Sequence, residues 1–515
     1  DLDEWHNKEI LEKIGNVSWR KSIFYLHGKN ENDLYSQYYR RLAYDEILSN
    51  LLVLSQVRKR VKKFKKLHKR FDDNLSNKII KNFNFSLSED QKNAVQEINY
   101  DLRSDYKMFR ILQGDVGTGK TIVSLVSAAN VIKSNYQVVM MAPTEILAKQ
   151  HFELSKKIFK STNVTIDFLI GKTKPKDKKI IQENLLTGKI NFLIGTHALF
   201  QKNILFKNLG LVIIDEQHKF GVKQRIELSN KGGKNCDILL MSATPIPRTL
   251  ALTVYGDLDV STMPELPKGR KAIMTRMIPP SRVEDAERFL VEQVREGRQC
   301  FVVCPLIDES ETILARAAVA EHERLRTTTL AELRVGLLHG RMPLAEKQSV
   351  MEAFREAKLD VLVTTPVIEV GIDVPNATVM MIQGANRFGL AQLHQLRGRV
   401  GRSDAQSVCI LIAQPGEQAR ERLSVFCETN DGFRIARADL HIRGQGDLFG
   451  AQQHGRDPLL CFADLRTDEP LLLRARQQAR AMVARDPELE APEHLRVRSI
   501  LETRHAERLR MWRVG

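Results

Sequence analysis

The stretch Gly114-Asp115-Val116-Gly117-Thr118-Gly119-Lys120-Thr121 decides the fold, because it fits the pattern G-x-x-x-x-G-K-[ST] at every position. An apolar run precedes it at 109–112, and the apolar positions of a helix follow it. A strand, a glycine-rich loop and a helix in this order form a P-loop, which holds phosphates with backbone N–H groups and the helix N-terminus. A glycine-rich turn with a chance lysine would not explain this context. The motif therefore predicts a nucleoside triphosphate site.

Each residue type in the loop has a chemical reason to be there. Gly114, Gly117 and Gly119 let the backbone approach the phosphates closely. Lys120 would reach the β- and γ-phosphates, and Thr121 would offer its hydroxyl to Mg²⁺. We therefore expect hydrolysis of the triphosphate as well as binding.

Two acids follow another buried apolar run. Residues 209–214 lead directly into Asp215 and Glu216, within the tetrapeptide Asp-Glu-Gln-His. In an open parallel sheet, the residues just past the strand ends share the edge where the P-loop lies. Asp215 would hold hydrated Mg²⁺, and Glu216 would orient or deprotonate the attacking water. Ser242 and Thr244 end the next apolar run, where they would sense the site; a surface acidic turn is the alternative for the two acids.

The segment before the P-loop offers a candidate for base recognition. Ser88 is an expected N-cap with two acids after it, but capping by Ser88 does not account for Gln91. A glutamine amide can pair with both the donor and the acceptor on the edge of adenine. Gln91 is therefore a candidate contact to the base.

An arginine-rich segment, 392–402, packs three arginines onto a helix and a glycine-broken turn. Alone, such a segment is usually surface or a non-specific anion site. Beside a P-loop on another domain, Arg399 and Arg402 would be fingers that stabilise charge on the transferring phosphoryl group, and Gln395 belongs to the same segment. The reaction would then require the two domains to close.

Composition favours a polyanionic partner. The 515 residues contain 79 Lys and Arg against 63 Asp and Glu, which gives a net charge of +16. A basic run at 58–70 is either the solvated face of a helix or a contact to a phosphate backbone. Six cysteines without a C-x-x-C pair predict reduced core thiols, with no zinc or disulfide framework.

The ends of the chain and its apolar runs bear on location. No apolar run approaches the roughly 18–20 residues that a membrane helix needs. The first residues lack the basic and apolar regions of a signal peptide, and they lack an initiator methionine. We expect a piece of a longer protein that works in the cytosol, away from membranes.

Short apolar runs separated by helical stretches predict buried strands of parallel sheets. The first series is 108–112, 137–142, 191–195, 210–214 and 237–241, and the second is 300–304, 335–338, 360–364, 377–382 and 407–412. A helix is expected over 33–70. The fold class is therefore α/β, with two tandem parallel-sheet domains joined near 265–280.

The basic residues change type along the chain. Lysine predominates up to Lys271, whereas arginine replaces it afterwards except at Lys347 and Lys358. The change reflects either two differently constrained domains or a hybrid of two relatives.

Together these segments resemble a superfamily 2 helicase or translocase. The motifs occur in the order of that family: 142–145, 195–197, the Asp215–His218 box, 242–244, 364–373 and 395–402. The resemblance implies two RecA-like domains that use ATP and Mg²⁺, and a face that grips the phosphates of one DNA strand without reading bases. The implied DNA contacts are Thr144, Thr196, His197, Thr364 and Thr365. Gly371 and Asp373 are implied nucleotide contacts.

Finer motifs resemble the RecG-type branch of DNA helicases. The box continues as Lys219-Phe220-Gly221-Val222, with lysine where arginine is usual. Residues 429–455 resemble the translocation motif that this branch shares with the transcription-repair coupling factor. By motif position, the hairpin's two arginines and glutamine are Arg422, Arg443 and Gln453. Gln445 and His454 depart from the usual proline and serine.

The resemblance implies four regions and a function. The regions are a helical connector at 1–80, two RecA-like domains at 81–268 and 269–420, and a translocation hairpin with a helical extension at 421–515. The implied function is ATP-driven tracking on duplex DNA and remodelling of forks and Holliday junctions, by a monomer. We find no counterpart of the family's N-terminal wedge, which splits the fork.

Three alternatives are weighed against this function. A transcription-repair coupling factor usually carries DEEQRFG where this chain has His218. An RNA helicase would not need the hairpin motif. A non-catalytic DNA-binding scaffold would be expected to lose Lys120, Glu216 or Arg402, and all three are present.

Overall fold

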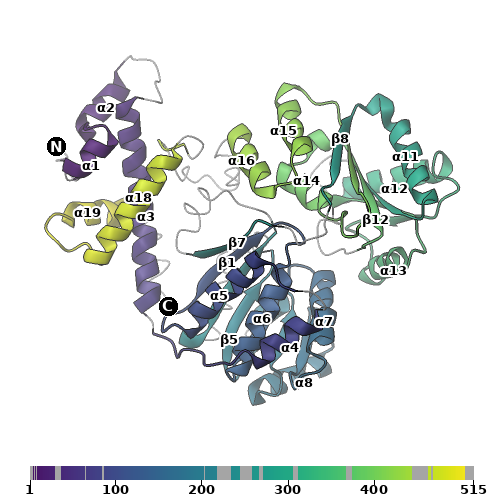
Figure 1. Cartoon of the computed structure of the whole chain (residues 1–515), viewed down its shortest axis with the longest axis horizontal. Helices are drawn as coiled ribbons and strands as arrows, with labels where there is room; N and C mark the ends of the chain where they lie inside the picture. The colour runs from purple at the N-terminus through teal and green to yellow at the C-terminus, as the bar shows by residue number, and fades with distance from the viewer. Residues whose placement is uncertain are drawn as a thin grey trace.

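The computed structural model consists of two α/β lobes and a helical unit (Figure 1). It describes residues 4, 6, 8–28, 36–63, 65–83, 86–201, 203–216, 233–243, 258–265, 271–304, 311–366, 374–443, 462–464 and 468–504. The first lobe contains the P-loop and the second contains the arginine-rich segment. The helical unit combines segments from both ends of the sequence.

Seven strands form the sheet of the first lobe, in the order β3-β4-β2-β5-β6-β1-β7. All neighbouring strands pair in parallel. The strands are β1 Phe109–Gly114, β2 Gln137–Met141, β3 Ile166–Leu169, β4 Phe192–Gly195, β5 Leu209–Ile214, β6 Asp237–Ser242 and β7 Asp259–Met263. The strands are parallel, and β6 alone separates β5 from β1. The acids that follow β5 and the P-loop that follows β1 therefore lie close together, at the carboxyl ends of these strands.

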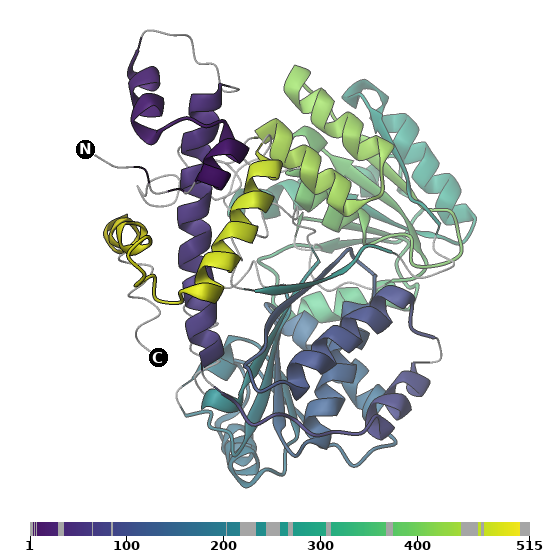
Figure 2. The same cartoon turned by 60° about the vertical axis from the view of Figure 1, so that its left-hand side comes forward.

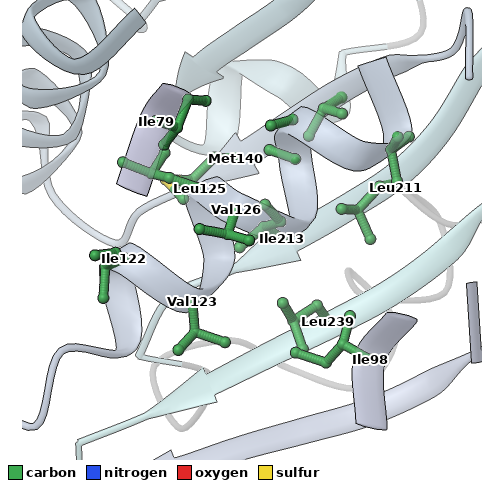
Figure 3. Packing of buried hydrophobic residues seen from close by; sticks show 14 of the residues in the cluster. Ile79, Ile98, Ile122, Val123, Leu125, Val126, Met140, Leu211, Ile213 and Leu239 are labelled. Atoms are coloured by element: carbon green, nitrogen blue, oxygen red, sulfur yellow. The ribbon is translucent and has the colours of Figure 1, made fainter. Parts of the chain in front are cut away.

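Both faces of this sheet are buried, which explains the continuous apolar runs in its sequence. Val138 and Met140 on β2 belong to one hydrophobic cluster, whereas Val139 and Met141 belong to another on the opposite face. Figure 3 shows helix α6 lying over the first of these faces. In the described part of the lobe, the helices are α4 Asn74–Asn82, α5 Glu89–Arg103, α6 Lys120–Lys133, α7 Glu145–Phe159 and α8 Pro175–Thr187, with short 3₁₀ turns at His197–Phe200 and Gly233–Asn235.

The second lobe repeats this arrangement with a six-stranded parallel sheet, ordered β10-β11-β9-β12-β13-β8. Its strands are β8 Met274–Ile278, β9 Gln299–Val303, β10 Val335–Leu338, β11 Val361–Thr364, β12 Ala377–Gln383 and β13 Val408–Ile412. Its helices are α11 Val283–Arg295, α12 Glu311–Thr327, α13 Leu344–Arg355, α14 Leu390–Arg397, α15 Glu417–Glu428 and α16 Gly432–Arg443, with 3₁₀ turns at Pro280–Arg282 and Ala385–Arg387. Two clusters again bury the two faces.

The helical unit joins the beginning of the chain to its end. Helix α18 (Glu469–Arg485) packs along α3 (Gln37–Lys63), and the two helices are side by side in both views (Figures 1 and 2). The same cluster includes residues of α1 (Lys8–Ile14) and α19 (Leu495–Arg504), while α2 (Trp19–His27) packs near α3. The buried carboxylate of Glu46 on α3 accepts hydrogen bonds from the backbone N–H groups of Phe462 and Ala463, at 2.7 and 3.0 Å.

The predicted fold class is confirmed: the chain is α/β, with two tandem parallel-sheet domains flanked by helical segments. Every predicted strand is present, and none of its bounds differs by more than two residues. Three strands escaped prediction, β3, β7 and β8, and each lies at an edge of its sheet. An edge strand is covered by fewer neighbours, so it does not need a continuous apolar run. In β8, for example, no residue is fully buried.

The basic run at 58–70 corrects two expectations. The predicted helix over 33–70 ends earlier, because α3 stops at Lys63 and Lys65 forms an antiparallel bridge with Tyr106. Lys66 and Lys69 are neither on a solvated face nor available to DNA. Both side chains are fully buried, and both bind the carboxylate of Asp237, at 2.8 and 2.5 Å. Of the two interpretations offered for this run, neither holds at these two lysines.

Asp237 is the centre of this buried cluster. Its carboxylate also accepts the backbone N–H of Met108 at 2.6 Å, while Lys66 donates to the carbonyl oxygen of Asp101. Burial lowers the pKa of Lys66, although the charge of Asp237 acts in the opposite direction. The cluster attaches the segment that follows α3 to the first lobe, where β1 and β6 begin.

The described cysteines are free thiols, and most of them are buried, as expected for core residues. Cys236, Cys300, Cys304 and Cys409 are buried free thiols and Cys427 is partly buried, whereas Cys461 lies outside the described residues. Burial raises the pKa of Cys236 to about 12. Among the described helices, none is both long enough and apolar enough to cross a membrane.

Replacing Asp237 with asparagine tests the buried cluster. Asp237→Asn should lower the free energy of unfolding of the first lobe by about 3–5 kcal/mol, because two buried ammonium groups lose their counter-ion. Chemical denaturation measures this. The matched control is Lys92→Ala, which removes the exposed pair with Glu89 and should cost about 0.5 kcal/mol or less. Equal costs for the two variants would contradict the assigned role.

Candidate nucleotide site between the lobes

The P-loop begins where β1 ends and finishes where α6 begins. Gly117 and Gly119 have φ of 84° and 85°, in the left-handed region that side chains disfavour. A Cβ atom at Gly119 would lie 2.3 Å from Nε2 of Gln91, and one at Gly114 would lie 2.7 Å from Oγ1 of Thr118. The loop therefore requires glycine at these positions for conformation and for space.

Lys120 lies inside the loop. Its Nζ donates to the carbonyl oxygens of Gly114 and Asp115, both at 2.7 Å. Burial lowers the pKa of Lys120, and the nearby carboxylates of Glu216, Asp215 and Asp115 oppose that shift. The ammonium group thus sits among three acids at the mouth of helix α6.

Asp215 follows β5 and is held by a histidine. Nε2 of His151, on α7, lies 2.8 Å from Oδ2 of Asp215, while Oδ1 accepts the backbone N–H of Glu216 at 3.0 Å. Burial would raise the pKa of Asp215, but the hydrogen bond from His151 and nearby positive charge lower it below its ordinary value. Asp215 is therefore kept ionised. Each carboxylate oxygen can accept a further hydrogen bond, so water ligands of a metal ion remain compatible with this arrangement.

Glu216 is held in a strained conformation beside Asp215. Its φ of 49° lies in the left-handed region, which is costly for a residue with a side chain. Burial and the negative charge of Asp215 raise the pKa of Glu216 to about 7, while Lys120 and Arg399 act in the opposite direction. A carboxyl group with a pKa near neutrality suits the transfer of a proton from water.

Arg399 belongs to the second lobe and lies near these groups of the first. Its positive charge contributes to lowering the pKa of both Lys120 and Glu216. Arg399 and Gln395 are buried, whereas Arg402 is partly exposed, with Nε donating to the carbonyl oxygen of Gly398 at 3.4 Å. The structure brings Arg399 to the acids and the P-loop, as expected for a site shared by two lobes.

A second contact joins the lobes at Asp115. The side chain of His394, on α14, binds Oδ1 of Asp115 through Nε2, and Oδ2 of Asp115 accepts the backbone N–H of Gly432 at 3.3 Å. Burial would raise the pKa of Asp115, but the hydrogen bond from His394 lowers it below its ordinary value. The N–H of Val116 and the charge of Lys120 act in the same direction as His394. The lobes approach closely here, as the space around Gly398 shows: a Cβ atom at this residue would lie only 2.7 Å from Cβ of Val116.

Gln91 links the N-terminus of α5 to the P-loop. Its Nε2 donates to the carbonyl oxygen of Thr118 in the P-loop at 2.8 Å. Its Oε1 accepts the backbone N–H of Ser88, while Ser88 caps the N–H of Gln91, so the two residues form a capping box. Capping does account for Gln91, contrary to our expectation. Contact of Gln91 with an adenine base stays a prediction.

The residues expected to face DNA lie at the carboxyl ends of strands. Thr144 follows β2 and caps α7, with its side chain accepting the N–H of Leu147 at 3.3 Å. Thr196 and His197 follow β4, which neighbours β2; Thr196 is buried and its Oγ1 has no hydrogen-bond partner, whereas His197 is exposed. These positions lie at the carboxyl ends of neighbouring strands of the first sheet, and their contact with DNA stays a prediction.

In the second lobe, Thr364 and Thr365 lie at the carboxyl end of β11 and are buried. Thr364 donates through Oγ1 to the carbonyl oxygen of Thr365, and Oγ1 of Thr365 has no hydrogen-bond partner. Ser242 is buried at the end of β6, beside the acids that follow β5. Their contacts with DNA and with the nucleotide site stay predictions.

The predicted hairpin residues are only partly described. Arg422 lies on α15, and its Nη2 donates to the carbonyl oxygen of Asn386 at 2.8 Å. Arg443 ends α16, but the position of its side chain lies outside the described structure. Other predicted residues lie wholly outside the described residues: Gln217, His218, Thr244, Gly371, Asp373 and Gln453.

Three residues of this site were not predicted from the sequence: Asp115, His151 and His394. Asp115 and His394 occupy positions inside motifs that other residues define, and His151 is six residues beyond Glu145 on α7. The signal available in the sequence was an ionisable residue within or next to a motif. The S-x-x-Q spacing at 88–91 would also have indicated the capping box.

Comparison with known families divides the chain into three matched segments. Residues 88–253 match the family described as DEAD/DEAH box helicase, and residues 281–404 match the helicase conserved C-terminal domain. Residues 429–508 match domain 3, C-terminal, of the ATP-dependent DNA helicase RecG. The chain thus carries both halves of a helicase core followed by a RecG-specific segment.

Two curated relatives and one solved structure extend this similarity. The ATP-dependent DNA helicase RecG of Thermotoga maritima is 44% identical over 497 residues, which cover 96% of this chain and 63% of that protein. RecG of Bacillus subtilis is 43% identical over 464 residues, covering 90% of this chain and 68% of that protein. The structure of RecG bound to a three-way DNA junction matches with a TM-score of 0.75 and 40% identity, over 93% of this chain and 62% of that chain. The chain spans about two thirds of its relatives' length.

The raised pKa of Glu216 makes stability depend on pH. Because the folded pKa of about 7 exceeds the ordinary value of 4.5, the stabilising protonated form is fully present below pH 4.5 and is lost as pH rises through 7. Glu216→Gln cannot ionise. It should therefore be more stable than the wild type by about 1–3 kcal/mol at pH 8, with a much smaller difference at pH 5.

Denaturation at both pH values measures this difference, with Glu332→Gln as the control. The side chain of Glu332 is 87% exposed, so its replacement should have little effect at either pH. A gain in Glu216→Gln that is equal at pH 5 and pH 8 would contradict the assigned pKa.

Proposed function

Because the chain belongs to the RecG family of ATP-dependent DNA helicases, we propose that it hydrolyses ATP to move along duplex DNA and acts on branched DNA. Forks and recombination junctions are the expected substrates. The solved relative at 40% identity is bound to a three-way junction, which supports this class of substrate. The chain spans 63% of the Thermotoga maritima relative, so the proposal is limited to tracking and remodelling by the parts that these 515 residues contain.

One arrangement carries the proposal: the segment of the second lobe that holds Arg399 packs against the P-loop, where a Cβ atom at Gly398 would lie 2.7 Å from Cβ of Val116. Arg399 is buried there, and its charge acts to lower the pKa values of Lys120 and Glu216 of the first lobe. An arginine that approaches the phosphoryl group from another lobe stabilises charge as that group transfers. Hydrolysis then depends on the relative position of the lobes. A motor needs this dependence, because it converts a chemical cycle into movement.

The residues of the first lobe fit ATP and a magnesium ion. The P-loop glycines leave the backbone open to phosphates, and Lys120 is held at the centre of the loop. Asp215 stays ionised and Thr121 stands at the start of α6, so together they would hold Mg²⁺. The ion, when bound, neutralises charge on the β- and γ-phosphates.

Glu216 and the arginines would then complete the chemistry. Glu216 would accept a proton from the attacking water, a role that its pKa near 7 favours. Arg399 would stabilise the transferring phosphoryl group, and Gln395 and Arg402 stand on the same segment. Gly371 and Asp373 would complete the nucleotide contacts by motif position.

DNA would bind across both lobes. Thr144, Thr196 and His197 stand at one edge of the first sheet, and Thr364 and Thr365 stand at the corresponding ends of the second. Contacts of this kind to the backbone would leave movement independent of sequence. The net charge of +16 supports a polyanionic partner. Arg422, Arg443 and Gln453 would turn closure of the lobes into steps along the duplex.

The alternatives are less well supported. The relatives at 43–44% identity are RecG proteins, which does not favour a transcription-repair coupling factor. A non-catalytic scaffold is not favoured either, since Lys120 and Arg399 are buried and Glu216 is partly buried near them. Action as a monomer in the bacterial cytoplasm is part of the proposal.

The rate of ATP hydrolysis with different nucleic acids tests the function. We expect about tenfold or greater stimulation by duplex and by branched DNA over the rate without DNA, and weaker stimulation by single strands. Stimulation should fall as salt rises, because phosphate contacts release counter-ions. A rate of ATP hydrolysis that none of the three nucleic acids raises would contradict a DNA motor.

Lys120→Ala is the matched control for the source of the activity. It should abolish hydrolysis, since the phosphates lose their buried cation, while DNA affinity stays within about threefold of the wild type. Hydrolysis at the wild-type rate in Lys120→Ala would place the reaction elsewhere.

A further inference from the structure

The carboxylate of Asp115 connects the P-loop to two elements of the second lobe. Its backbone carbonyl oxygen accepts Nζ of Lys120 at 2.7 Å and Oγ1 of Thr118 at 3.0 Å, so the backbone of Asp115 is part of the P-loop's own network. Its side chain accepts hydrogen bonds from His394 and from the N–H of Gly432 in the second lobe, and Oδ1 also accepts the N–H of Val116 in the P-loop at 2.7 Å. A single buried residue thus contacts both the phosphate-binding loop and the second lobe.

The hydrogen bonds of His394 identify its tautomer. Nη2 of Arg397 lies 3.2 Å from Nδ1 of His394, and because an arginine can only donate, Nδ1 must be the acceptor. Nε2 therefore carries the proton and donates it to Oδ1 of Asp115. Arg397 is itself fixed, since Nη1 donates to the carbonyl oxygen of Phe426 at 2.8 Å and the guanidinium lies 4.1 Å from the centre of the Phe426 ring. The donor that reaches Asp115 is rigidly placed.

The other partner of Asp115 is the first residue of α16. Asn430 holds the start of this helix by accepting the N–H of Ile273 and donating to its carbonyl oxygen. Asp431 accepts the N–H groups of Phe433 and Arg434, which caps the helix. The N–H of Gly432 is left for Asp115, and a carboxylate at this end of a helix is favoured by the helix dipole.

Helix α16 runs from this contact to the predicted translocation residues. Its twelve residues end at Arg443, so the helix carries any displacement of its first residue over roughly 18 Å. Beyond the undescribed residues, the chain at 462–463 is attached to α3 through Glu46. The predicted translocation segment is therefore bounded by an end that contacts the P-loop and an end that is attached to the connector.

We propose that Asp115 is a positioning residue that couples the occupancy of the P-loop to the position of α16, with His394 as its partner. The inference rests on the proposed function. A bound phosphate would draw the ammonium of Lys120 away from the carbonyl oxygen of Asp115 and so change the conformation of the P-loop. Because Asp115 belongs to that loop, the contact of its carboxylate with the N–H of Gly432 would change as well. Loss of the contact leaves hydrolysis possible but separates it from movement.

The test compares movement with hydrolysis in His394 variants. The ratio is the rate of third-strand displacement from a triplex divided by the rate of DNA-stimulated ATP hydrolysis. In His394→Ala this ratio should fall about fivefold or more, because Asp115 loses its rigid donor. In His394→Gln the side-chain amide donates from a similar position, so the ratio should recover to within about twofold of the wild type.

Gln392→Ala is the matched control, since Gln392 caps the same helix and does not contact Asp115. Its ratio should equal that of the wild type. The proposal is overturned if His394→Ala keeps the wild-type ratio, if His394→Gln recovers nothing, or if Gln392→Ala loses as much as His394→Ala. Absence of hydrolysis in the wild type would instead refute the proposed function.

A second measurement serves for variants that hydrolyse ATP too slowly for the ratio of displacement to hydrolysis to be determined. Hydrogen exchange of the backbone amides at 432–434 is measured with and without a non-hydrolysable ATP analogue. The analogue should change exchange about fivefold or more in the wild type and much less in Asp115→Asn and in His394→Ala. An equal change in all three proteins would overturn the proposal.

Discussion

The contact of Asp115 with His394 and with the N–H of Gly432 is the interaction on which the arrangement of the two lobes depends. It places α14 against the P-loop, which brings Arg399 toward Glu216 and Lys120. The close approach of Gly398 to Val116 leaves no room for a side chain at the same place. Because buried polar contacts are costly unless their geometry is satisfied, the lobes can meet only in a narrow set of positions.

Much of the fold and of the nucleotide site could be predicted from the sequence, because the physical demands there act on neighbouring residues. Strands buried on both faces produce continuous apolar runs, such as 209–214, and a phosphate loop requires glycine at fixed positions. The chemical types of Lys120, Asp215 and Glu216 follow from the needs of phosphoryl transfer. Arg399 could be assigned to the same site only because motifs on two domains were considered together.

The rest could not be predicted, because it depends on contacts between distant segments. Lys66 and Lys69 lie in a basic run that predicts exposure, yet Asp237, far along the chain, buries them. The edge strands β3, β7 and β8 lack a burial signal. His151 and His394 have no local pattern that indicates their partners, Asp215 and Asp115. The strained backbone of Glu216 is likewise a property of the folded site.

The rate of the chemical step in Arg399→Ala tests most directly whether the site is shared between the lobes. Single-turnover hydrolysis, measured with saturating DNA, should fall by about 10³-fold, while nucleotide affinity changes only about threefold, because the guanidinium acts on the transferring group. A rate within about threefold of the wild type would contradict a shared site.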